Sequence, residues 1–200
     1  MTDSRIVNAC ARNNANWCDS VLISAGATTR FQTGFWCAKG KQLPLFPNLV
    51  TLSPKANPEL TAALKALPLD ATVKDSFGTL NLAPLGFKKL LSGTWLFRPP
   101  VAKRKPPVPF NWHKIANQEG LRSWVAAWNA DESVRGLFPP KLLLDPSVSF
   151  ASVSADGTAL KAGAVINDGP ALGGQEIAGI SNVFSRKSWL FSALHDLLAP

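Results

Sequence analysis

The sequence predicts a layered α/β (α+β) fold, in which a mixed, mainly antiparallel sheet is flanked by helices and a smaller α/β half precedes it. The composition is globular, because 46% of the 200 residues are hydrophobic and 17% are charged. Short strand-like apolar runs alternate with helical patterns along the whole chain. A chain of this length buries a substantial core, as one large domain or two small ones.

A proline-rich stretch over 99–110 marks the clearest boundary. It contains five prolines and the basic run Lys103-Arg104-Lys105. Prolines lack a backbone donor and favour extended conformations, so this stretch is expected to be an exposed spacer. The predicted organisation is an N-terminal α/β half over 1–98, a linker over 99–110 and a C-terminal unit over 111–200.

The first half shows the element order α-β-β-α-β-α-β. The predicted elements are a helix over 7–25, strands over 31–38 and 49–52, a helix from 58, a strand over 72–77, a helix over 82–91 and a strand over 94–98. The second helix has the clearest start: Asn57 can cap it, Pro58 suits its first turn, and Glu59 is favourable near the positive end of the helix dipole.

The second half is expected to contain a helix, a helical turn, three strands and a helix. The first helix, over 119–129, carries Trp124 and Trp128 on one apolar stripe, which predicts packing against a sheet. The strands are predicted over 148–153, 159–166 and 177–184, and a final helix begins with Ser185 as its cap. The third strand is apolar on both faces and is therefore expected to be central in its sheet.

The charge and hydropathy of the chain indicate which kinds of partner it can bind. The net charge is +8, and the surplus lies in the first half and the linker: 11 Lys/Arg stand against 5 Asp/Glu up to Arg98. Such a surplus is typical of proteins that bind nucleic acid or an anionic cofactor, but no aromatic-interleaved RNA-binding motif accompanies it, and a solvated basic surface is the simpler interpretation. The apolar runs are too short to span a bilayer and the N-terminus lacks a signal-peptide core, so we expect a cytoplasmic protein without a membrane partner.

Cysteine and histidine are too sparse to predict a metal site. Three cysteines, Cys10, Cys18 and Cys37, lie far in sequence from the two histidines, His113 and His195. Metal sites need several ligands at short spacings, and no such spacing occurs. We expect no metal and three reduced, mostly buried thiols.

Several short motifs resemble a known family. The second half carries Ala162-Gly-Ala-Val-Ile-Asn and then Gly179-Ile-Ser-Asn-Val-Phe184, and the first half carries Pro47-Asn48-Leu-Val-Thr-Leu52 and Val73-Lys-Asp-Ser-Phe77. With the element order of the second half, these motifs resemble bacterial GNAT-type acyl-CoA N-acyltransferases. The resemblance implies a GNAT-like C-terminal unit that is incomplete or degenerate at its C-terminus, and a partial GNAT-like unit over 1–98.

The resemblance also implies a cofactor and a binding segment. In this family the pyrophosphate of acetyl-CoA or another acyl-CoA binds between the fourth strand and the third helix. The matching residues here are Ser181, Asn182, Val183, Phe184, Ser185, Arg186 and Lys187. The family's glycine-containing signature is absent from this loop, where Arg186 and Lys187 offer phosphate-binding cations instead.

The chemistry of the family requires a base for the acceptor amine and a proton donor for the leaving thiolate. The candidate catalytic residues are Glu176, Asp75 and Ser181, and the chain contains no tyrosine, the frequent thiolate donor in this family. The acceptor is expected to be an amine-bearing small molecule or protein.

Three functional hypotheses remain open, of which the third and weakest is a nucleic-acid binder. The first is an acyl-CoA-dependent N-acyltransferase-like protein, active or decayed. The alternative is a non-catalytic interaction module whose basic N-terminal half contacts an acidic partner. A further strand is expected beside 177–184, supplied by 73–77 or 94–98 or by a second chain in a homodimer, because an uncovered apolar strand edge invites pairing.

Overall fold

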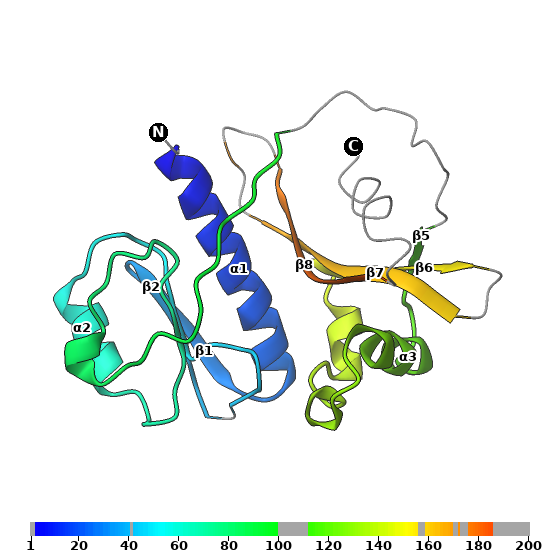
Figure 1. Ribbon diagram of the computed structural model, residues 1–200, viewed down its shortest axis with the longest axis horizontal. Helices are drawn as coiled ribbons and strands as arrows, with labels where there is room; N and C mark the ends of the chain where they lie inside the picture. The colour runs from blue at the N-terminus through cyan, green and yellow to red at the C-terminus, as the bar shows by residue number, and fades with distance from the viewer. Residues whose placement is uncertain are drawn as a thin grey trace. The chain divides into compact units, whose positions relative to one another are not determined.

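The computed structural model describes residues 3–40, 42–99, 112–155, 159–169, 172 and 176–185 (Figure 1). The chain divides into two compact units, Met1–Leu96 with Gly169–Ile177, and Phe97–Asp168 with Ala178–Pro200. Each unit contains a four-stranded sheet in the described residues, and three α-helices accompany the two sheets. Most strand pairs are antiparallel, which confirms a mixed α/β protein.

The first unit begins with α1 (Ser4–Ser24), close to the predicted range. Its buried face carries small side chains, among them Ala15 and Cys18, which let the helix approach a sheet closely. The Nε1 of Trp36, on the adjacent sheet, donates a hydrogen bond of 2.7 Å to Oδ1 of Asp19 on α1. This bond ties α1 to one face of that sheet.

The first sheet follows the order β1-β2-β3-β4, and only its last pair is parallel. Its strands are β1 (Thr28–Gln32), β2 (Phe35–Lys39), β3 (Leu49–Thr51) and β4 (Val73–Lys74). The prediction of one strand over 31–38 is wrong, because the chain turns at Gly34, whose φ of 86° is readily adopted by glycine. The turn converts the predicted strand into the β1/β2 hairpin.

The opposite face of this sheet packs against α2 (Pro58–Lys65), so the sheet lies between α1 and α2 (Figure 1). The helix begins as predicted: Oδ1 of Asn57 accepts a hydrogen bond of 2.7 Å from the backbone N–H of Leu60. Leu60 then packs against Phe35 and Leu49 in a buried apolar cluster.

The chain after β4 has less regular structure than the sequence predicts. The helix expected over 82–91 is reduced to one 3₁₀ turn, η1 (Ala83–Leu85), and no strand forms over 94–98. Pro84 lies inside this turn and Gly86 follows it with a φ of 84°, so a longer helix cannot continue. The strand expected over 72–77 is limited to β4.

The second sheet is an antiparallel meander in the order β5-β6-β7-β8. Its strands are β5 (Trp112–Lys114), β6 (Val148–Ala155), β7 (Ala159–Asp168) and β8 (Ala178–Ser185). The three long strands confirm the predictions to within two residues, whereas β5 was not predicted. No described residue pairs with the second edge of β8, which was expected to be central. Completion of this sheet by 73–77 or 94–98 is wrong, because β4 pairs with β3 and 94–98 is not a strand.

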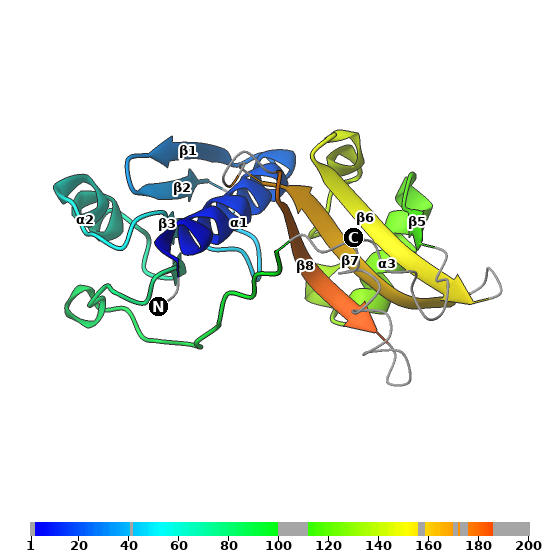
Figure 2. The ribbon, with the colours of Figure 1, turned by 90° about the horizontal axis from the view of Figure 1, so that it is seen from above.

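An aromatic core packs α3 (Gln118–Trp128) against this sheet, as the tryptophan stripe predicts (Figure 2). Trp124 is completely buried, and its Nε1 donates a hydrogen bond of 3.0 Å to the carbonyl of Ala151 on β6. The rings that surround it are those of Trp128, Phe138, Phe150 and Phe184. Two 3₁₀ turns, η2 (Glu132–Val134) and η3 (Pro140–Leu144), follow the helix.

The remaining predicted segments lie largely outside the described residues. Of the linker over 99–110, the structure describes Pro99 alone. The helix expected from Ser185 falls on residues that are not described, and Ser185 itself is the last residue of β8.

Candidate functional site

The strand β8 contains an irregularity in the segment where the sequence predicts the cofactor. Gly163 of β7 faces Phe184, and Val165 faces Ser181. One residue of β7 therefore spans the interval in which β8 carries two, Asn182 and Val183. This arrangement is a β-bulge, which interrupts the hydrogen-bond ladder and bends the strand that carries it.

Asn182 gives the bulge its local conformation. Its φ is 49°, in the left-handed region that L-residues rarely adopt. Asparagine is among the non-glycine residues that tolerate this region best, because its short polar side chain can bond locally. Val183 follows with 38% of its surface exposed. The sequence thus places a tolerant residue where the backbone needs one.

Ser181 precedes the bulge and carries an unsatisfied hydroxyl. Its Oγ is buried and has no hydrogen-bond partner among the described residues. A buried hydroxyl without a partner costs free energy, so its retention needs a structural or functional explanation. The hydroxyl can donate one hydrogen bond and accept others from a bound group.

Phe184 anchors the other end of the bulge in the core. Its ring lies 5.3 Å from that of Trp124 between centroids, at an interplanar angle of 80°. Gly163 makes this contact feasible: a Cβ on Gly163 would lie 2.7 Å from Cζ of Phe184 and 2.7 Å from Nε1 of Trp124. The ring of Phe184 is therefore a packing element, and the bulge is held from the α3 side of the sheet.

The predicted cofactor residues share one strand as far as the structure describes them. Five of the seven, from Ser181 to Ser185, belong to β8, and Ser185 is its last residue. Arg186 and Lys187 lie outside the described residues. The structure brings the serine hydroxyl and the bulge together, which the sequence motif alone does not indicate.

The three catalytic candidates occupy different settings. Glu176 is exposed, two residues before β8 begins. Asp75 lies in the other sheet's unit, after β4. Its Oδ2 accepts a hydrogen bond of 2.8 Å from the backbone N–H of Leu80, and its Oδ1 accepts one of 3.2 Å from Oγ1 of Thr51. The carboxylate of Asp75 thus organises the turn after β4.

A second polar cluster joins α1 to β4. Burial lowers the pKa of Lys74, whose Nζ lies 4.5 Å from the centroid of the Trp95 ring. Burial raises the pKa of the nearby Cys18 thiol to about 12, a change that the positive charge of Lys74 partly opposes. A thiol with so high a pKa is inert at neutral pH. The cluster was missed by sequence reasoning, because no spacing rule brings residue 18 to residue 74.

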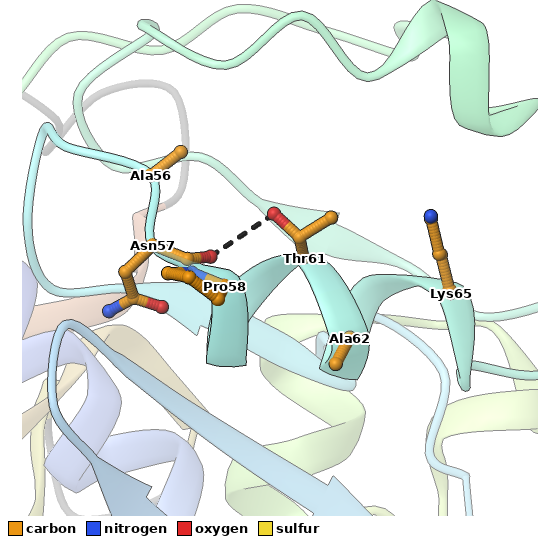
Figure 3. A pocket seen from close by; sticks show the side chains of 6 residues that line it. All are labelled: Ala56, Asn57, Pro58, Thr61, Ala62 and Lys65. Carbon is orange, nitrogen blue, oxygen red and sulfur yellow. Dashed lines mark hydrogen bonds between the residues drawn. The ribbon is translucent and has the colours of Figure 1, made fainter.

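A further hollow lies at the start of α2 (Figure 3). Its volume is about 490 Å³, and the residues lining it are Ala56, Asn57, Pro58, Thr61, Ala62 and Lys65. The hydroxyl of Thr61 donates a hydrogen bond of 3.1 Å to the carbonyl of Asn57, and the Asn57 amide oxygen caps the helix. Two of its polar side chains therefore already serve the helix itself.

The described residues contain no group of three or more His, Cys, Asp and Glu side chains placed to hold a metal ion. All three cysteines are free thiols; Cys18 is buried, and Cys10 and Cys37 are partly so. No helix in the described part of the chain has the length and apolar character needed to cross a bilayer. Comparisons with known protein families, curated proteins and solved structures found no match to this chain.

Proposed function

We propose that the protein is an acyl-CoA-dependent N-acyltransferase-like protein whose cofactor diphosphate binds at the bulge of β8. The observation that carries this proposal is the left-handed Asn182 within an interrupted strand. Backbone groups that alternate between right- and left-handed conformations form concave sites for anions. Bulges are also over-represented next to active sites, where they redirect the backbone.

Two further features support an anion at this place. The unsatisfied hydroxyl of Ser181 lies directly before the bulge and can donate to a phosphate oxygen. In the sequence, Arg186 and Lys187 follow β8 without an intervening residue, and their charges match a diphosphate. These side chains take the role that glycine-rich loops fill with backbone amides elsewhere.

The proposed reaction is attack of an amine nitrogen on the thioester carbonyl of an acyl-CoA. A carbon–nitrogen bond forms, the carbon–sulfur bond breaks, a base takes the amine proton, and the CoA thiolate is protonated. Glu176, exposed just before β8, is our candidate for the base, and solvent water protonates the thiolate, because the Ser181 hydroxyl is engaged with the diphosphate. Asp75 is less suited, because two of its acceptor positions hold the turn after β4. The acceptor is an amine-bearing small molecule or protein of the bacterial cytoplasm.

A calorimetric titration of the full chain with acetyl-CoA tests the proposal. Two variants at one position separate the bulge from the side chain: Asn182→Gly keeps the left-handed conformation available, whereas Asn182→Val opposes it at about 1–2 kcal/mol. We expect the glycine variant to bind acetyl-CoA within about threefold of the parent and the valine variant about tenfold more weakly. Equal affinity of the two variants, or no heat at millimolar acetyl-CoA, contradicts the proposal.

The alternative function is a non-catalytic interaction module whose basic N-terminal half contacts an acidic partner. The observation that favours it is the engagement of the Asp75 carboxylate in backbone hydrogen bonds, which makes this carboxylate structural rather than catalytic. This alternative predicts an intact fold that ignores acetyl-CoA, and a partner complex that weakens as salt is raised.

A further inference from the structure

The segment over 88–96 is an exposed stretch of chain that belongs to no helix or strand (Figures 1 and 2, green). It lies wholly within the first unit. Three of its leucines are almost fully in solvent: Leu90 is 81% exposed, Leu91 is 80% exposed and Leu96 is 89% exposed. Three such side chains within seven residues form a cluster of the kind that marks an interaction site, unlike the single exposed leucines of ordinary surfaces.

Trp95 fixes the end of this segment to the sheet. Its Nε1 donates a hydrogen bond of 2.8 Å to the carbonyl of Ser76, and the ammonium of Lys74 lies over its ring at 4.5 Å. The indole is only partly exposed, while the next side chain, that of Leu96, is among the most exposed large hydrophobic side chains of the described residues. The segment is therefore held against the residues of β4 by one side chain and presents its leucines outward.

The charge of the surrounding sequence has one sign. Residues 76–118 contain seven Lys and Arg and no Asp or Glu. Two of these cations, Lys88 and Lys89, are exposed and stand directly before the two adjacent leucines. Their aliphatic stems can lie along an apolar surface while their ammonium groups remain at its polar boundary.

We propose that the 88–96 segment docks on the surface of an anionic lipid bilayer. Leu90, Leu91 and Leu96 insert at the boundary between headgroups and acyl chains, and Lys88 and Lys89 contact the lipid phosphates. This proposal departs from the sequence-based expectation of no membrane partner, which rested on the lack of a bilayer-spanning run and of a signal peptide; the segment proposed here would lie on a bilayer and not span it.

The observations favour a lipid surface over other anionic partners. The exposed apolar side chains of the segment are leucines, which cannot stack on nucleobases as aromatic side chains do. Leu90 and Leu91 are adjacent in the chain and both exposed, so no single face of a strand or helix presents them to a fixed protein groove. A bilayer interface has no fixed shape and accepts both, together with the charges beside them.

Vesicle co-sedimentation of the full chain tests the proposal. The probes are phosphatidylcholine vesicles alone and the same vesicles with one part in three phosphatidylserine. We expect binding to the anionic vesicles only, and a partition coefficient about 30-fold lower for Lys88→Gln/Lys89→Gln, since each lysine near the surface contributes about fivefold. Leu90→Ser/Leu91→Ser should lower it by at least about tenfold.

Two control variants match these changes elsewhere on the surface. Lys55→Gln/Lys65→Gln removes the same charge from exposed positions, and Leu69→Ser/Leu144→Ser removes leucines that are 108% and 82% exposed. We expect each control to lower partitioning by less than about threefold. The proposal is overturned if the controls lose as much binding as the test variants, or if the parent does not bind anionic vesicles. It is equally overturned if Leu90 and Leu91 support self-association in ultracentrifugation without vesicle binding.

Discussion

Replacing Gly163 by alanine probes the packing that holds the bulge of β8. The added methyl group would lie 2.7 Å from Cζ of Phe184 and 2.7 Å from Nε1 of Trp124, well inside normal contact distance. The Trp124 side chain cannot easily move away from the added methyl group, because it is fully buried and its Nε1 donates a hydrogen bond to the carbonyl of Ala151. Overpacking of this kind costs about 1–3 kcal/mol, and loss of the indole hydrogen bond adds about 1 kcal/mol.

We therefore expect Gly163→Ala to lower the free energy of unfolding of the second unit by about 3 kcal/mol. Urea denaturation followed by tryptophan fluorescence measures this value. Gly136→Ala is the matched control, because Gly136 is exposed, has no positive φ and has no atom within 4 Å of an added Cβ. Its effect should stay within about 0.5 kcal/mol of the parent.

A second substitution tests whether the added methyl group clashes with Phe184. In Gly163→Ala/Phe184→Leu the smaller side chain makes room for the methyl group, so the double variant should be more stable than the sum of the single changes predicts by at least about 1 kcal/mol. A loss below about 0.5 kcal/mol for Gly163→Ala, or strict additivity in the cycle, refutes the packing argument.

Three further predictions concern the first unit. Asn57→Ala should lower the free energy of unfolding by about 1–2 kcal/mol, as measured by urea titration. Asn57→Asp should lower it by less, because aspartate still accepts the hydrogen bond from the N–H of Leu60 and loses only the donor to the carbonyl of Thr33. Asp75→Asn should lower the free energy of unfolding by about 1–2 kcal/mol and leave acetyl-CoA affinity within about twofold, because the carboxylate organises the turn after β4. Unchanged stability together with lost acyl transfer would show that Asp75 is catalytic instead. The pKa of Cys18 is raised in the folded state to about 12, from an ordinary 9.0. The buried neutral thiol therefore contributes its full stabilisation below pH 9, and this contribution declines as the pH rises toward 12. Denaturation curves of the parent should show the decline, and those of Cys18→Ala should show less of it.

The sequence predicts the strands of the second unit well, because their apolar runs are long and bounded by turn residues. β6 and β7 begin at the predicted residues, and α3 packs Trp124 against the sheet as its stripe indicates. β5 escapes prediction, since three residues reading Trp-His-Lys show no alternation. In the first half, the prediction of a single strand over 31–38 fails at Gly34, where the chain adopts the positive φ of a hairpin turn.

The sequence predicts part of the candidate site, and the register between β7 and β8 determines the rest. The segment from Ser181 onward is indicated by its motif, but the bulge depends on how β7 and β8 align, which no local pattern fixes. Gly163 offered a signal: an isolated glycine inside a strand often marks a close approach, here of Phe184 and Trp124. The contact between Lys74 and Trp95 depends on long-range packing, and no local sequence pattern predicts it.

The central claim is that the bulge of β8 binds the diphosphate of an acyl-CoA. A titration of the ¹⁵N-labelled full chain with acetyl-CoA, followed amide by amide in heteronuclear NMR spectra, tests it most directly. The account predicts saturable shifts concentrated at the amides of Ser181, Asn182 and Val183, and similar shifts with ADP, which shares the diphosphate. Saturable shifts confined to other parts of the chain, or spectra unchanged at millimolar ligand, would contradict it.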